Sequence, residues 1–309
     1  MKKIFSVLIM LIISLSVEIS SSAESNGFLY AVREDGTAVI TGYYGDPCGE
    51  LVIPSTIDGY AVTEIGNDSF SHKKGINKLN LPESVLKIGD DAFNGCSGLE
   101  EIYFSEGLRE IGKQAFANCG YLHSVALPDS LTDLKPWAFF NCFALENVVV
   151  GNGLESIPSY AFEKCFILKE VSLGENVRLI EQYAFAKSGI ERIYIPLSLK
   201  EVEDYAFYEC RNIKLIDYAG DYENWLDINI GERNSEFASA YKNELAHPVQ
   251  PMEKKDSDLL GVIICVAFAA VVVTETIFIV TRKKPGVCRY CNAKTEEGSV
   301  FCGNCGSKL

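Results

Sequence analysis

Histidine and basic charge are both scarce in this chain of 309 residues. It has three histidines, and its 28 lysines and arginines face 42 aspartates and glutamates, for a formal net charge of −14. The histidines His72, His123 and His247 form no zinc-protease motif, and there is neither a nucleophile elbow nor a phosphate-binding glycine loop. An acidic surface repels nucleic acid. These shortages argue against an enzyme and against a nucleic-acid-binding protein.

What the chain does have is a phenylalanine that returns at nearly fixed intervals. Five gaps of 23 residues and a last gap of 22 separate Phe70, Phe93, Phe116, Phe139, Phe162, Phe185 and Phe207. An aliphatic residue lies five positions before each of them, and alanine directly precedes six of the seven. A period of roughly 20–29 residues is typical of a leucine-rich-repeat solenoid. We therefore predict a solenoid of about seven repeats.

Each repeat is too short to bury its own apolar side, so neighbouring repeats must share one core. Segments such as Leu99–Phe104 alternate apolar and polar residues, which predicts short strands that pair in parallel from one repeat to the next. The segment around each phenylalanine returns the chain along the other side. A buried phenylalanine removes about 150–250 Å² from water, a gross gain of ~4–6 kcal/mol, so we assign these rings to the core.

The same alternation predicts which side chains point outward from the strands. They are Lys78, Asn80, Glu101, Tyr103, Ser124, Ala126, Asn147, Val149, Glu170, Ser172, Arg192, Tyr194, Leu215 and Asp217. Tyrosine is a common anchor in protein interfaces. Glu101, Tyr103, Arg192 and Tyr194 are therefore the candidate partner-binding residues.

One repeat carries a recognisable pattern. Leu79, Leu81, Pro82, Ser84 and Val85 are followed by Ile88-Gly89, Ala92-Phe93 and Cys96. This pattern resembles the BspA-like (treponemal-type) leucine-rich repeat of bacterial surface proteins, over roughly residues 28–243. The resemblance implies a non-enzymatic binding protein, since known members are adhesins and binders of host proteins. The usual glycine is absent at Lys135-Pro136 and Ile157-Pro158, which should stiffen those return segments without breaking the repeat frame.

The beginning of the chain predicts export. Two lysines and a short apolar stretch from Ile4 to Val17 precede Ser21-Ser22-Ala23, a small-residue cleavage site for a signal peptide over residues 1–23. Residues 24–50 are expected to form a capping hairpin that turns at Glu34-Asp35-Gly36 and covers the first edge of the stack. The solenoid and its C-terminal cap should then occupy residues 51–243.

The end of the chain predicts a single membrane span. After a linker over residues 244–258, the 22 residues from Leu259 to Val280 are apolar enough to cross a hydrocarbon core of about 30 Å, and we predict a transmembrane helix over 259–281. Arg282-Lys283-Lys284 follows directly, which places the C-terminus in the cytoplasm and the repeats outside. Glu275 within the span either reaches the interface or pairs with a partner helix.

Cysteines recur within the repeats as well. Cys96, Cys119, Cys142, Cys165 and Cys210 each lie three residues after a repeat phenylalanine, and Ser188 takes the same place in another repeat. A strand-like spacing of about 4.8 Å would permit disulfides between neighbours. Side chains that point inward in parallel have poor geometry for that bond, so buried free thiols are the favoured interpretation.

The final segment, residues 282–309, contains the second strong motif. Cys288 and Cys291 form one CxxC pair, and Cys302 and Cys305 form another after a spacer of ten residues. Four thiolates in two such pairs are the ligands of a closed, tetrahedral structural Zn²⁺ site. The segment resembles a small zinc ribbon, which would need the metal to fold. A redox dithiol is the alternative.

Two functions follow from this organisation. The first is a membrane-tethered adhesion or interaction protein whose solenoid binds an extracellular protein or glycan. The second is a receptor-like or assembly protein that couples the outer domain to a cytoplasmic protein through the zinc ribbon.

Metal analysis tests the ribbon. We expect one zinc ion per full-length chain, because the four thiolates complete a tetrahedral shell. Replacing Cys302 and Cys305 by serine should abolish it. A zinc content unchanged in that double variant would contradict the assignment.

Overall fold

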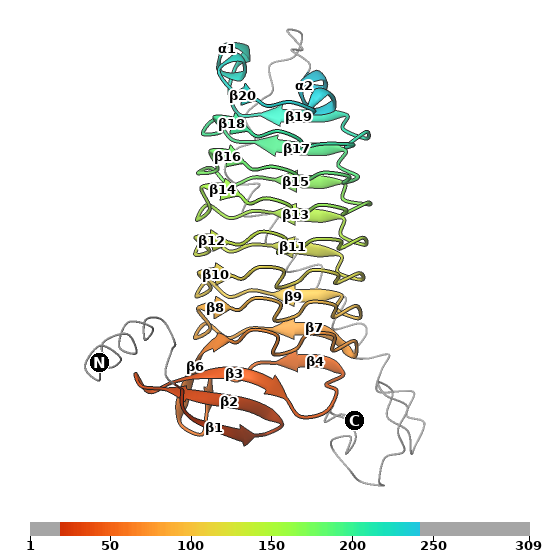
Figure 1. Ribbon diagram of the computed structural model, residues 1–309. Coiled ribbons are helices and arrows are strands. Elements are labelled where there is room, and N and C mark those ends of the chain that lie inside the picture. The colour runs from red at the N-terminus through yellow and green to blue at the C-terminus, as the bar shows by residue number, and fades with distance from the viewer. Residues whose placement is uncertain (1–18, 242–309) are drawn as a thin grey trace, which may run out of the picture. The chain divides into compact units, whose positions relative to one another are not determined.

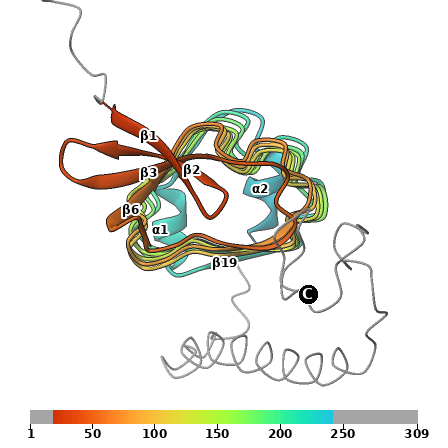
Figure 2. The same cartoon turned by 90° about the horizontal axis from the view of Figure 1, so that it is seen from below.

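The computed structural model describes residues 19–241, and the statements below concern this part of the chain. It is a parallel-strand solenoid of about eight turns, with two stacks of strands along its length (Figure 1). The predicted fold class is therefore confirmed for these residues. Viewed along the axis, the turns superimpose as closed coils (Figure 2).

One stack contains the longer strands of the repeats. Its members are β4 (Gly49–Val52), β7 (Ile76–Asn80), β9 (Glu101–Tyr103), β11 (Ser124–Ala126), β13 (Asn147–Val149), β15 (Glu170–Ser172), β17 (Arg192–Ile195) and β19 (Leu215–Tyr218). Strands β4, β7 and β9 pair in parallel, and so do β11 to β19. These are the strands that the apolar alternation predicts.

The other stack consists mostly of two-residue strands. They are β6 (Tyr60–Ile65), β8 (Lys87–Ile88), β10 (Glu110–Ile111), β12 (Asp133–Leu134), β14 (Ser156–Ile157), β16 (Leu179–Ile180), β18 (Glu201–Val202) and β20 (Asn229–Ile230). A further short strand, β5 (Thr56–Ile57), pairs antiparallel with β6. We did not predict this second stack as strands, because two residues are too few to show an alternation.

The second stack is interrupted between β12 and β14. In other turns, the residue that follows the short strand donates its amide to the turn before it, as Lys135 does to the Ile111 carbonyl and Glu181 to that of Ile157. Pro158 occupies this place after β14, and proline has no N–H to donate. The repeat frame nevertheless continues through this turn. We call this interruption the Pro158 seam.

The N-terminal end is covered by an antiparallel meander of β1 (Ile19–Ser25), β2 (Phe28–Arg33) and β3 (Thr37–Tyr43). Strand β3 pairs with β6, so the meander extends the short-strand stack. The rings of Phe28 and Tyr43 each lie 6.5 Å from that of Phe70, which covers the first repeat phenylalanine. The expected hairpin thus forms within residues 24–50. The predicted cleavage point after residue 23 lies within β1.

At the C-terminal end the column of rings extends beyond Phe207, the last phenylalanine that the repeat interval identifies. Two short helices, α1 (Tyr222–Leu226) and α2 (Ser235–Ala240), form the last turn with β20. Phe237 of α2 stacks on Phe207 with ring centroids 4.2 Å apart and planes 6° apart. The stack therefore continues into the cap. Helix α1 lengthens the last turn, so this phenylalanine falls outside the 23-residue interval.

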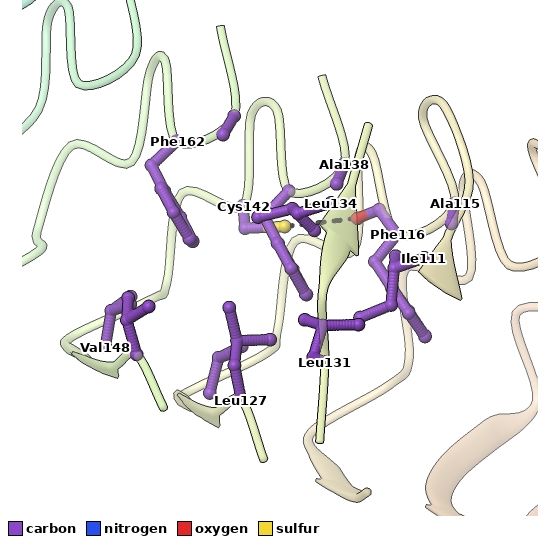
Figure 3. Close-up of a cluster of buried hydrophobic side chains, with 14 of the residues drawn as sticks. Ile111, Ala115, Phe116, Leu127, Leu131, Leu134, Ala138, Cys142, Val148 and Phe162 are labelled. Carbon is purple, nitrogen blue, oxygen red and sulfur yellow. Dashed lines mark hydrogen bonds between the residues drawn. The ribbon is translucent and has the colours of Figure 1, made fainter. Parts of the chain in front are cut away.

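The core is the column of repeat phenylalanines. All seven are fully buried, and neighbouring rings lie 5.1–5.5 Å apart with planes 1–11° from parallel. Aliphatic side chains from both strand stacks surround the column (Figure 3). The assignment of these rings to the core is confirmed.

The repeat cysteines are free and buried, which confirms that interpretation against disulfides. Each thiol donates a hydrogen bond to the carbonyl of a repeat phenylalanine in the turn before it, as Cys142 does to Phe116 at 3.2 Å (Figure 3). Burial raises the pKa of Cys142 to about 12 and that of Cys210 to about 11. The thiols are therefore neutral hydrogen-bond donors inside the core.

The predicted linker, transmembrane helix and zinc ribbon lie outside the described residues, as does most of the predicted signal peptide. Between residues 19 and 241, no helix is long and apolar enough to cross a membrane.

The raised pKa of Cys142 predicts a loss of stability at alkaline pH. The unfolded thiol loses its proton near pH 9.0, whereas the folded one keeps it to about pH 12, so the free energy of unfolding should fall over that range. In Cys142→Ser the hydroxyl does not ionise there, and the fall should be shallower by up to about 1.4 kcal/mol per pH unit. Denaturant unfolding at several pH values measures both slopes.

Cys48→Ser is the matched control, because Cys48 is only half-buried and lies outside the row of repeat cysteines. Cys48→Ser should change the alkaline slope of the free energy of unfolding less than Cys142→Ser does. Equal alkaline slopes for the wild-type chain and Cys142→Ser would contradict the assigned role of burial.

Candidate binding surface

The outward side chains of the longer strands form a continuous surface, which we call the strand face. Strand pairing aligns them in two rows within β4 to β9 and within β11 to β19, and these two sets of strands are not paired with each other. One row is Glu50, Lys78, Glu101, then Ser124, Asn147, Glu170, Arg192 and Leu215, and the other is Val52, Asn80, Tyr103, then Ala126, Val149, Ser172, Tyr194 and Asp217. Residues between the rows, such as Val148 and Val171, are buried. The predicted set of outward positions is therefore confirmed.

A first polar cluster lies on β7 and β9. The Tyr103 hydroxyl donates a hydrogen bond to Glu101 Oε2 at 3.0 Å. The Lys78 Nζ lies 4.7 Å from the centroid of the Tyr103 ring and 3.7 Å from Glu101 Oε2. These contacts hold the Tyr103 ring in place while 43% of the residue stays exposed. An exposed aromatic ring that is already fixed loses little conformational entropy on binding.

A second cluster lies on β17 and β19. Arg192 Nε forms an ion pair with Asp217 Oδ2 at 3.0 Å, and its guanidinium carbon lies 5.5 Å from the centroid of the Tyr194 ring. Burial, with Asp217 and Glu170 nearby, raises the pKa of Tyr194, while Arg192 opposes that shift. The phenol therefore stays protonated at neutral pH and can donate a hydrogen bond to a partner.

The structure brings Glu101 together with Tyr103 and Arg192 together with Tyr194, but it keeps the two pairs apart. Strands β11, β13 and β15 lie between them, so four strand spacings of about 4.8 Å separate the pairs by roughly 19 Å. The intervening row beside the tyrosines carries the small side chains Ala126, Val149 and Ser172. Tyr103 and Tyr194 thus border a stretch of shorter side chains on the strand face.

A hollow of about 480 Å³ opens over β13 to β19. Its lining residues are Asn147, Lys169, Glu170, Glu191, Arg192, Lys214 and Leu215. Lys169 pairs with Glu146 and Lys214 with Glu191, each at 2.6 Å. The hollow therefore presents paired charges of both signs and does not select a ligand of one charge.

Three of these lining residues were missed at the sequence level. Lys169, Glu191 and Lys214 directly precede the strands β15, β17 and β19, where a strict alternation places a side chain inward. These residues nevertheless stay accessible. Their recurrence as charged residues at one position of successive repeats was the available signal.

The predicted zinc ligands Cys288, Cys291, Cys302 and Cys305 lie outside the described residues. Over residues 19–241, no group of three or more histidine, cysteine, aspartate or glutamate side chains is placed to hold a metal ion.

The repeats match a known family model. The model for the BspA type leucine rich repeat region matches six copies, over residues 63–188 and 138–225. No curated protein matches the chain.

Solved structures share the fold. A leucine rich cell surface protein from Faecalibacterium prausnitzii A2-165 superposes with a TM-score of 0.59 at 28% identity, over 66% of this chain and 56% of that one. The chain thus matches little more than half of that relative. The Treponema pallidum leucine rich repeat protein superposes with a TM-score of 0.54 at 27% identity, over 74% of this chain and 100% of that one. The fold is that of bacterial leucine-rich-repeat surface proteins.

Proposed function

Since the chain belongs to the BspA-type leucine-rich-repeat family, we propose that it is a non-enzymatic, membrane-tethered surface protein that binds an extracellular protein or glycan through its strand face. The observation that carries the proposal is the arrangement of Tyr103 and Tyr194. Each ring is held by charged neighbours and borders a stretch of small side chains.

The charges of the strand face fit a polar partner. Both tyrosines lie beside a basic and an acidic side chain, and the hollow near Arg192 has paired charges of both signs. A surface that combines aromatic anchors with hydrogen-bonding groups suits a folded protein or a glycan.

The tether is proposed from the sequence. An export signal over residues 1–23 and an apolar span over 259–281, followed by three basic residues, support repeats outside the cell and a C-terminus inside it.

The alternative function keeps the same outer domain and adds a cytoplasmic partner. The four cysteines Cys288, Cys291, Cys302 and Cys305 favour it, since an adhesin has no need of a zinc ribbon inside the cell. Bound there, zinc would fold the ribbon and supply no catalysis. Loss of a specific cytoplasmic partner on deletion of residues 286–309 would support this alternative, and surface display and outer binding that persist with no such loss would contradict it.

Substitutions on the strand face test the leading proposal. Full-length chains displayed on cells are offered purified extracellular-matrix proteins and a glycan array. We expect specific binding that weakens about tenfold or more in Tyr103→Ala/Tyr194→Ala, because both aromatic anchors are lost. Tyr121→Ala is the matched control, because Tyr121 is 57% exposed and lies outside the strand face. Binding that is equal in all three chains would refute the strand face as the site.

Protease treatment of intact cells tests the topology. A tag placed after Leu309 should be protected, and a tag inserted at the exposed loop residue Tyr44 should be cleaved, because the repeats are proposed to lie outside. Permeabilised cells are the control, and both tags should be cleaved there. Cleavage of the C-terminal tag on intact cells would overturn the orientation.

A further inference from the structure

A second column of aromatic rings lies outside the core, on the side that follows the short strands. Trp137, Tyr160, Tyr183 and Tyr205 each lie three residues after a short strand, β12 to β18 in turn. Their ring centroids are 4.7, 4.9 and 5.0 Å apart, and neighbouring planes differ by only 3°, 5° and 15°. We call this column the aromatic ladder. It belongs to a different part of each turn from the strand face.

The backbone gives no reason for aromatic residues at this position. All four have φ between 58° and 62°, in the left-handed region that bulky side chains rarely adopt. The equivalent positions in the first three turns are Asp68, Asp91 and Gln114, with φ of 54–56°. The left-handed conformation is therefore common to these turns, and only the aromatic side chain distinguishes the last four.

Packing explains only part of the ladder. Trp137 and Tyr160 stack across the Pro158 seam, where the short strands do not pair, so this contact joins two turns that lack those hydrogen bonds. Tyr183 and Tyr205 follow β16 and β18, which pair normally. None of the four is a fully buried core residue. The aromatic character of Tyr183 and Tyr205 therefore needs another explanation.

The ladder exposes ring edges and hydroxyls, because the ring faces cover one another. The outer face of Trp137 is covered as well, by Lys113 Nζ at 5.1 Å, and Tyr208 packs edge-on against Tyr205. The edge of an aromatic ring carries partial positive charge. Sugars and nucleobases stack on ring faces, which are not available here. The ladder therefore suits a ligand that presents hydrogen-bond acceptors to ring edges.

The tyrosine hydroxyls are available as donors. Within residues 19–241, no protein group hydrogen-bonds to the hydroxyls of Tyr160, Tyr183 or Tyr205. Burial, together with the neighbouring tyrosines and Glu163, raises the pKa of Tyr183, so its phenol keeps its proton. The three tyrosines therefore form a row of hydroxyl donors on rings spaced by about 5 Å.

The spacing of the ladder tyrosines can be compared with the spacing of backbone carbonyls in each regular peptide conformation. Spacings of 4.9 and 5.0 Å place Tyr205 about 10 Å from Tyr160, close to the roughly 9.3 Å advance of one polyproline II turn. That helix has no internal hydrogen bonds, so its carbonyls are free, and every third one faces the same side. An extended strand repeats every ~6.6–6.8 Å on one side and does not match, and the carbonyls of an α-helix are already engaged.

We propose that the aromatic ladder docks a proline-rich segment in the polyproline II conformation, whose carbonyls accept hydrogen bonds from Tyr160 and Tyr205 while its apolar rings pack along the ring edges. This site is separate from the strand face and does not depend on the function proposed for it.

Peptide binding by the full-length chain tests the proposal. The probe is an uncharged, terminally capped peptide of about twelve residues with proline at every third position, long enough for about four turns. The reference peptide has glycine in place of each proline. We expect saturable binding of the proline peptide and weaker binding of the reference, which must pay the entropy of ordering its backbone.

Two double variants separate binding from folding. Tyr160→Asn/Tyr205→Asn should weaken peptide binding about tenfold, since both donating hydroxyls and their ring edges are lost. Asparagine suits the left-handed backbone, so the chain should fold. Tyr160→Phe/Tyr205→Phe keeps the rings and should weaken binding by a smaller factor. The strand-face control Tyr103→Asn/Tyr194→Asn should bind the peptide as the wild-type chain does.

Three results would overturn the proposal. The first is no saturable binding of the proline peptide by the full-length chain. The second is wild-type affinity in Tyr160→Asn/Tyr205→Asn. The third is ladder-dependent binding of a cello-oligosaccharide without binding of the peptide, which would assign the surface to a glycan instead.

Discussion

The structure depends on one constraint: a turn of about 23 residues cannot bury its own phenylalanine, so each ring must be covered by the rings before and after it. The two ends of the column then need covers from outside the repeats. Phe28 and Tyr43 supply one, and Phe237 of α2 supplies the other. The cysteines serve the same stacking, because each thiol ties its turn to a phenylalanine carbonyl in the turn before it. The ring stacking and the thiol–carbonyl hydrogen bonds thus both connect neighbouring turns along the axis of the solenoid.

The repeated interval made this core predictable from the sequence. The interval identified the seven rings, and the alternation placed Tyr103 and Tyr194 outward on their strands. Phe237 escaped prediction because the helix α1 breaks the interval, although its ring continues the column. The residues that line the hollow before β15, β17 and β19 were not predicted, because they stay accessible at positions where a regular alternation would turn them inward.

The aromatic ladder shows a different limit. The residue type at this position changes from turn to turn, from aspartate at Asp68 and Asp91 to tyrosine at Tyr183 and Tyr205. An alignment based on shared residues therefore does not reveal it. Four consecutive aromatic residues in one column of the alignment were the available signal. A position that can change freely between turns of identical backbone is also where a solenoid can acquire a ligand without disturbing its core.

The Pro158 seam has a consequence for how the array comes apart. In a solenoid, stability is approximately the sum of each turn's own stability and its coupling to the next turn, and cooperativity is limited by the weakest coupling. Between β12 and β14 the short-strand pairing is missing, while β11 and β13 remain paired. Between β9 and β11 the long-strand pairing is missing, while β10 and β12 remain paired. The array should therefore come apart first at one of these two interfaces, which lie in the middle of the described turns. At the Pro158 seam the Trp137–Tyr160 stack adds a contact between the two turns.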